Sequence, residues 1–211
     1  GGRHVPEPME EALDQLAAGY EGSIMGVLSP HQSVGVPECL KLFGTPEQKR
    51  RFLPLAATTH VTAFALTEPD VGSDPARLTT SLETTPEGDA YLLNGEKLWC
   101  TNGLDAKLLV VMARHQETQK ISAIVVETDT PGVEITHRCH FMGLRALRNG
   151  VMRFTNVCVP KENLIGEEGA GLRIALTALN TGRLSIPYGS VGAAKKPLEC
   201  AQSWAAQRPQ W

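Results

Sequence analysis

The chain has 211 residues, 42% of them hydrophobic, which is enough to bury one large core or two smaller ones. Its 20 basic and 23 acidic residues give a net charge of −3, which argues against a nucleic-acid partner, because nucleic acids bind basic surfaces. No apolar run approaches the roughly 18–20 residues that cross a bilayer, so we expect no transmembrane segment.

Residues 1–60 are predicted to be the last part of an N-terminal helical domain. Leu13, Leu16 and Ala17 recur at helical spacing, and residues 23–42 place apolar side chains on most helical turns. The chain begins with GGRH, without an initiator Met, and ends with PQW, and both ends lie in stretches of helical pattern. We therefore expect the chain to be an internal part of a longer protein.

A further helix is predicted just after Gly44, a residue typical of helix ends. Thr45 can cap the first backbone N–H groups, and Pro46 suits the first helical position. Gln48 stands where a capping box requires Glu or Gln, so residues 49–53 should follow as helix. We expect this corner to serve packing rather than chemistry.

Short β-like runs separated by turn residues occupy residues 61–160 and predict a middle domain. The expected strands are residues 62–66, 97–100, 108–112, 121–126 and 152–157. Because no helix separates them, we expect an antiparallel sheet of sandwich or barrel type. The Asn94-Gly95 pair predicts a hairpin, since a type I′ turn requires positive φ at both central residues.

Helical pattern returns after Gly169, so residues 161–211 are expected to begin a C-terminal helical bundle. One apolar stripe consists of Leu172, Ala175, Leu176 and Leu179, and a second lies within residues 191–206. The predicted fold class is therefore α+β and multidomain: a partial N-terminal helical domain, an antiparallel β-barrel-like middle domain, and the start of a C-terminal helical bundle.

Three segments hold side chains that could bind a planar ligand. Residues 64–74 run from a strand into a turn with several hydroxyls, although an ordered turn explains the same composition. Trp99 and Thr101 would share one face of a regular strand, although a core Trp is the simpler interpretation. Arg183 could hold an anionic or carbonyl group, or only complement a helix C-terminus.

Other candidate sites receive no support from the sequence. The five cysteines are odd in number and widely spaced, which favours a reducing compartment over a disulfide framework or a cysteine zinc site. His137 and His140 form the one close histidine pair, but in a strand they would face opposite sides, so no metal site is expected. The glycines at 166–171 lack the Lys of a phosphate loop.

The chain resembles the acyl-CoA dehydrogenase family in six motifs that follow the family's order. The run FALTEPDVGSD at residues 64–74 is similar to the family's first flavin signature, and LNGEKLWCTNG at 93–103 resembles the second. Further matches lie at residues 31–35, 42–49, 154–169 and 179–184. The family's fold, a helical domain, a β-barrel-like domain and a four-helix domain, agrees with the order of elements predicted above.

This resemblance implies FAD as cofactor and α,β-dehydrogenation of a fatty acyl-CoA in fatty-acid β-oxidation, with hydride passing from the β carbon to flavin N5. The implied flavin-binding residues are Phe64, Ala65, Leu66, Thr67, Gly72, Ser73, Trp99, Cys100 and Thr101. The implied substrate-binding residues are Ser73, Asn180, Thr181, Gly182 and Arg183. Hydroxyl donors would stabilise the reduced flavin, and the Trp would cover one face of its ring.

The reaction also needs a base to remove the proton α to the thioester, and the family uses one Glu for it. In most members that Glu lies late in the C-terminal domain, and in a minority it stands where this chain has Gly182. We therefore assign no catalytic residue, and expect Glu68, Glu167 and Glu168 to have structural roles. The chain alone is expected to bind FAD weakly and not to turn over.

The resemblance also implies an electron-transferring flavoprotein as partner and a homodimer or homotetramer for the complete protein. It implies the cytoplasm of a bacterium or the mitochondrial matrix of a eukaryote, and it leans towards very-long-chain members. Two alternatives remain open. One is an acyl-CoA oxidase or flavin monooxygenase of the same fold, and the other is a non-catalytic acyl-CoA-binding or assembly protein.

Overall fold

A computed structural model describes residues 23–145 and 147–210 of the chain. The predicted helical stripe of Leu13, Leu16 and Ala17 lies outside these residues. The described part contains helices before residue 60, a sheet, and a long final helix, and this confirms the predicted α+β fold class.

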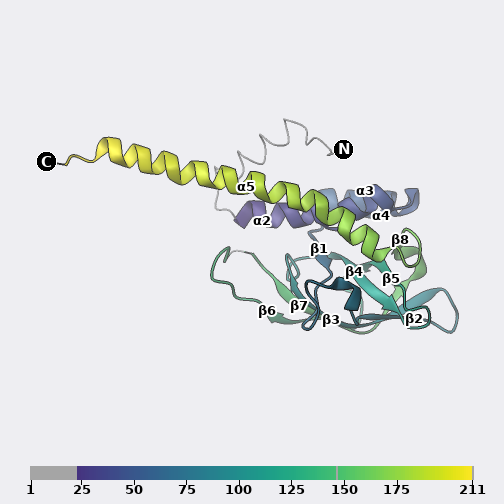
Figure 1. The fold of residues 1–211 in the computed structure, drawn as a ribbon. Helices are drawn as coiled ribbons and strands as arrows, with labels where there is room; N and C mark the ends of the chain where they lie inside the picture. Colours follow the sequence, from purple (N-terminus) through teal and green to yellow (C-terminus); the bar gives the residue numbers. More distant parts are fainter. Residues whose placement is uncertain (1–22, 146, 211) are drawn as a thin grey trace.

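The helices lie together on one side of the sheet (Figure 1). They are α2 (Ser23–Ser29), α3 (Val36–Phe43), α4 (Pro46–Thr58) and α5 (Gly171–Gln207), and a π-helical turn, η1 (Pro30–Val34), joins α2 to α3. Apolar side chains of α3, α4 and α5 pack against the strands β4 (Leu108–His115) and β5 (Ile121–Glu127) in one buried cluster. The helical layer therefore rests on β4 and β5, which lie towards one edge of the sheet.

Eight strands form one sheet. They are β1 (Thr62–Ala65), β2 (Ser81–Thr84), β3 (Ala90–Cys100), β4 (Leu108–His115), β5 (Ile121–Glu127), β6 (Val133–Arg138), β7 (Gly150–Pro160) and β8 (Leu164–Ile165). The strand order is β6-β7-β3-β2-β4-β5-β8. Strand β1 lies off this path and pairs with the first half of β4, whereas β2 pairs with the end of β4. The sheet is mixed rather than wholly antiparallel, because β4 runs parallel to both β1 and β2. Strand β3 runs antiparallel to β2. The chain reverses again after β3, so β4 runs in the same direction as β2.

The predicted hairpin at Asn94-Gly95 is wrong. Strand β3 runs through this pair without turning, and its pairing with β7 shifts register between Leu93 and Gly95. Gly95 has a φ of +142°, and a Cβ there would lie 2.7 Å from the Cα of Thr80. The glycine therefore serves a bulge and a close backbone approach, which local composition does not distinguish from a turn.

Strand β4 is buried on both faces, which explains its unbroken apolar run. Leu108, Val110 and Met112 face the helices, whereas alternate residues such as Leu109 and Val111 belong to a second cluster. That cluster gathers side chains from β1, β3, β4, β5 and β7, so the sheet curls around it in the manner of a barrel.

Helix α5 is one helix of 37 residues where two separate stripes were predicted. Ile174, Ala175 and Ala178 are its residues in the shared core. Residues 180–183 therefore lie within the helix, and the dipole of a helix C-terminus does not account for Arg183. Among the described residues, none of the helices combines the length and apolar character that crossing a bilayer requires.

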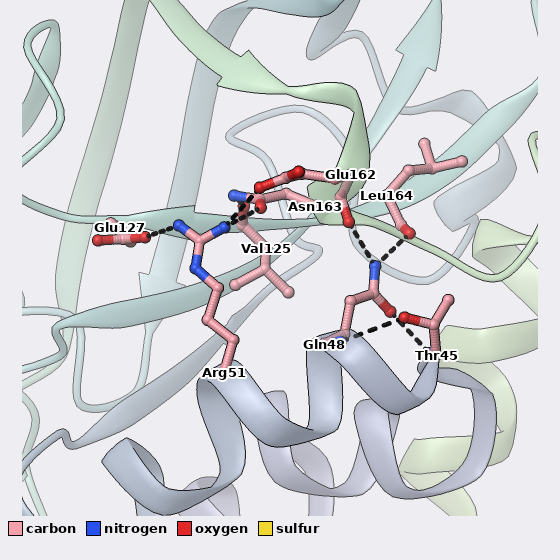
Figure 2. A network of polar contacts seen from close by, with 8 residues as sticks. All are labelled: Thr45, Gln48, Arg51, Val125, Glu127, Glu162, Asn163 and Leu164. Carbon is pink, nitrogen blue, oxygen red and sulfur yellow. Dashed lines mark hydrogen bonds and ion pairs between the residues drawn. The ribbon is translucent and has the colours of Figure 1, made fainter.

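The predicted capping box at the start of α4 is confirmed, and it has a further role (Figure 2). Gln48 Oε1 accepts from the Thr45 backbone N–H at 3.0 Å, while Gln48 Nε2 donates to the carbonyls of Glu162 and Leu164, each at 2.7 Å. One helical turn later, Arg51 bonds to Glu127, Glu162 and Asn163. The helix is thus fixed to the sheet edge by both side chains.

Replacing Gln48 by Ala is expected to lower the free energy of unfolding by about 2 kcal/mol, because it removes a buried side chain and leaves three partly buried backbone groups without partners. Urea denaturation measures the loss. Gln116→Ala is the matched control, since the Gln116 amide makes one long, exposed bond to Ser81 at 3.4 Å. Equal losses for the two variants would contradict the role given to Gln48.

Candidate functional site

A buried ion pair ties the loop after β1 to the end of β3. Lys97 Nζ lies 2.9 Å from Glu68 Oε1 and donates to the Leu66 carbonyl at 3.1 Å. The next residue, Leu98, donates its backbone N–H to the Thr67 carbonyl at 2.8 Å. The two segments singled out in the sequence, residues 64–74 and 99–103, are therefore neighbours in space.

Glu68 is held as a structural anion, in agreement with its expected role. It is 4% exposed, and it accepts hydrogen bonds from the Thr79 N–H, the Thr79 hydroxyl and the Thr80 N–H. Burial would raise the pKa of Glu68, but the Lys97 charge and these hydrogen bonds lower it to about 2. An anion so paired is unsuited to act as a base.

The remaining residues of the first segment differ in exposure. Phe64 packs against the helix-side core, Ala65 is buried, and Gly72 and Ser73 are exposed. Within the described residues, the hydroxyls of Thr67 and Ser73 make no hydrogen bond, which leaves them open to a ligand.

The second segment leaves the strand in a strained turn. Trp99 has a φ of +58° and is 56% exposed, and Asn102 has a φ of +65°. The register also shifts between Lys97 and Cys100, so the regular alternation that would place Trp99 and Thr101 on one face is interrupted. Left-handed non-glycine residues are uncommon and cluster at functional sites.

Burial sets the chemistry of the cysteine in this turn. Cys100 is 2% exposed, and burial raises the pKa of its thiol to about 12. A thiol so protonated is a poor nucleophile. Its backbone, rather than its sulfur, is therefore what it can offer a ligand.

An apolar cavity of about 470 Å³ opens between α2, η1 and α5. Its lining consists of Gly26, Ser29, Pro30, Val34, Thr101, Leu144, Leu147, Leu179, Gly182, Arg183, Ile186, Gly189, Ser190 and Ala193. Of the candidate residues, Thr101, Gly182 and Arg183 meet here. No Asp or Glu of the described chain is in this lining.

The two other candidates on α5 contribute indirectly. Asn180 Oδ1 accepts from Arg183 Nη1 at 2.9 Å, which steadies the guanidinium. The Thr181 hydroxyl donates to Glu38 Oε1 at 3.0 Å and so joins α5 to α3. A Cβ at Gly182 would collide with Val34 Cγ2, so a Glu at this position would have to displace the Val34 side chain.

The π-helical turn η1 supplies two cavity residues, and neither was assigned a role from the sequence. His31 holds the turn, since its Nδ1 accepts from the Thr62 N–H at 3.0 Å while the Thr62 hydroxyl donates to the His31 carbonyl at 3.0 Å. Burial lowers the pKa of His31, which favours this neutral, accepting form. π-turns often occur at functional sites.

Asn149 is a further residue that sequence patterns did not indicate. It is 6% exposed, and its Nδ2 donates to the Thr101 hydroxyl at 3.1 Å and to the Trp99 carbonyl at 3.4 Å. Its Oδ1 is buried and has no hydrogen-bond partner among the described residues. The bonds span 48 and 50 residues of chain, which no local pattern reveals.

A basic pocket of about 260 Å³ lies beside the apolar cavity and shares Leu144 and Leu147 with it. Arg138 and Arg145 line it and form no ion pair within the described chain, so they could hold an anion such as a phosphate. His140 also lines it, and its ring lies 6.4 Å from that of His137, because β6 ends before His140 and the expected alternation stops.

Comparison with known proteins gives a consistent result. Residues 63–157 match the family model described as acyl-CoA dehydrogenase, middle domain. A "probable acyl-CoA dehydrogenase" of Mycobacterium tuberculosis is 51% identical over 100% of this chain and 33% of its own length. A very long-chain specific acyl-CoA dehydrogenase of Bos taurus is 37% identical over 94% of this chain and 32% of its own.

Solved structures agree. The acyl-CoA dehydrogenase of Bacillus anthracis, complexed with FAD, superposes with a TM-score of 0.90 at 36% identity, over 96% of this chain and 34% of that one. The chain spans about a third of the length of the curated relatives named above. With the middle-domain match, the fold and the signature segments in agreement, the chain belongs to the acyl-CoA dehydrogenase family.

Proposed function

We propose that this chain provides flavin-binding and acyl-binding parts of an FAD-dependent acyl-CoA dehydrogenase. The observation that carries the proposal is the junction of the two signature segments by Lys97 and Glu68, next to an apolar cavity that Thr101 lines. The Bacillus anthracis relative, described as complexed with FAD, supports the same cofactor here. When bound, FAD would accept a hydride from the β carbon of the acyl group.

The residues present suit a flavin. The segment from Phe64 to Thr67, with Gly72 and Ser73, offers backbone groups and two open hydroxyls. Trp99 offers an exposed aromatic face, and Thr101 a hydroxyl at the cavity wall. Asn149 Oδ1, which no described residue satisfies, also favours a ligand that brings a donor, because buried acceptors are normally hydrogen-bonded.

The chain's own residues would bind and orient the two ligands. Hydroxyl donors such as Thr67 and Thr101 would stabilise negative charge that develops on the ring. The apolar walls of the cavity would exclude water from the acyl chain, and Arg183, steadied by Asn180, would face the polar end of the substrate. Ser73, Thr181 and Gly182 complete the proposed substrate-binding set.

The proposed base lies outside the described residues. Glu68 is committed to Lys97, and Glu168 accepts from the Thr118 hydroxyl on the surface. Neither is in the lining of the apolar cavity, and Gly182 has no room for a Glu unless Val34 moves. The α-proton would therefore be removed by a carboxylate that another segment supplies.

The similarity to the very long-chain specific relative of Bos taurus and the volume of the cavity support a substrate with a long acyl chain.

We further propose that the reduced flavin passes its electrons to an electron-transferring flavoprotein. Oxygen consumption separates this from an oxidase, and binding of FAD without any reduction by acyl-CoA in the complete protein would favour the non-catalytic alternative.

The purified chain is expected to bind FAD. Palmitoyl-CoA is expected not to bleach the bound flavin, because no Asp or Glu of the described residues lines the cavity. Thr101→Val should weaken FAD binding about tenfold, since it removes one hydrogen bond and little volume. Flavin fluorescence measures the affinity, and absorbance measures the reduction.

Thr118→Val is the matched control, because the Thr118 hydroxyl bonds to Glu168 on an exposed loop and not in the cavity. Bleaching by palmitoyl-CoA would show that the base lies within this chain. Absence of FAD binding would refute the cofactor assignment itself.

A further inference from the structure

The side chain of Asn149 has one possible orientation. A backbone carbonyl oxygen can only accept a hydrogen bond, so the atom that faces the Trp99 carbonyl must be the amide nitrogen. The same nitrogen lies 3.1 Å from Thr101 Oγ1. The Thr101 hydroxyl therefore accepts from Asn149, and its own proton is free to donate elsewhere.

The main chain holds Asn149 in place independently of its side chain. Its carbonyl accepts from the Cys139 N–H at 2.9 Å, just before β7 begins at Gly150. A substitution at this position therefore removes the carboxamide and leaves the anchoring backbone bond.

A second buried asparagine shows what a purely structural amide looks like. Asn163 donates from Nδ2 to the Val125 carbonyl at 3.0 Å, and its Oδ1 accepts from Arg51 at 3.2 Å, so both halves of its amide have partners (Figure 2). Asn149 differs, because its Oδ1 is buried and has no partner within the part of the chain that the structure describes. An amide satisfied on one half only, beside a strained turn at a cavity, is typical of a functional site.

We propose that Asn149 is a positioning residue of the flavin site: it turns the Thr101 hydroxyl so that its proton is donated towards the bound ring. The inference rests on the proposed function. It adds a residue that the signature segments do not contain, because Asn149 reaches Thr101 from a different part of the chain.

The test is a double-mutant cycle between Asn149→Ala and Thr101→Val, with FAD affinity, the visible spectrum of the bound flavin and its midpoint potential as readouts. Asn149→Ala is expected to weaken FAD binding about tenfold and to make the potential more negative, since a donor to the reduced ring is misdirected. In the Thr101→Val background the same change should alter the affinity less than about twofold.

Two further variants separate positioning from packing. Asn149→Asp keeps the size of the side chain but faces Thr101 with an acceptor, so it should behave like Asn149→Ala. Asn163→Ala should lower thermal stability and leave the flavin spectrum and potential unchanged.

If Asn149→Ala still weakened FAD binding tenfold in the Thr101→Val background, the inference would be overturned and the cofactor assignment would remain intact. A midpoint potential of Asn149→Asp equal to that of the wild type would have the same meaning. Failure of the unsubstituted protein to bind FAD would overturn both.

Discussion

Replacing Lys97 by Met is expected to lower the free energy of unfolding by about 3–5 kcal/mol, because it leaves the buried Glu68 carboxylate without its counter-charge. The Leu66 carbonyl loses its donor at the same time. Since this pair joins the two signature segments, FAD binding should be lost together with stability. Urea denaturation measures the first effect and flavin fluorescence the second.

The double variant Glu68→Gln with Lys97→Met should recover about half of the stability, because no unpaired charge then remains in the core. Arg153→Met, which breaks the exposed pair with Glu96, is the matched control and should cost less than about 1 kcal/mol. Equal losses for Lys97→Met and Arg153→Met would contradict the importance of burial.

The same pair predicts how stability depends on pH. The pKa of Glu68 is about 2 in the folded chain against an ordinary value of 4.5, so its contribution is complete above about pH 4.5 and is lost as the pH falls towards 2. Glu68→Gln should therefore flatten the acid side of the stability profile. An unchanged acid limb would show that another carboxylate controls it.

Local patterns located several of the regular elements. Alternation and β-branched runs located β1, β4, β5 and β7, and the capping residues Thr45 and Gln48 located the start of α4. These signals act within a few residues of the chain, as do the physical effects that produce them. Strands β2 and β8 were not predicted, because β8 has two residues and the SLET sequence of β2 contains only one apolar residue.

The candidate site was predicted only in part, for a physical reason. The signature segments were recognised, but the contacts that shape them join distant residues: Lys97 with Glu68, Asn149 with Thr101, and His31 with Thr62. Each partner alone is an ordinary polar residue. The long helix α5 also continues through Pro187 and Pro197, where a local rule predicts a break.

Gly95 does not form the turn that the local sequence predicts, but its conformation is important for stability. Gly95→Val is expected to cost about 3–4 kcal/mol, because the φ of +142° is strained for a branched residue and its Cβ would lie 2.7 Å from the Thr80 Cα. Displacing Thr80 would also break its N–H bond to Glu68. The substitution should therefore raise the pKa of Glu68 as well as unfold the chain at lower urea.

Two other glycines separate the causes of that loss. Gly88 also has a positive φ, of +77°, but a Cβ there would lie more than 4 Å from any atom of the described residues, so Gly88→Val isolates backbone strain. Gly143 has neither restriction, and Gly143→Val should change stability by less than about 0.5 kcal/mol. If Gly95→Val lowered the free energy of unfolding no more than Gly88→Val, the close approach to Thr80 would not contribute to stability. A clear excess for Gly95→Val would instead show that stability depends on the close approach of β3 to Thr80, whose backbone N–H bonds to Glu68 in the first signature segment.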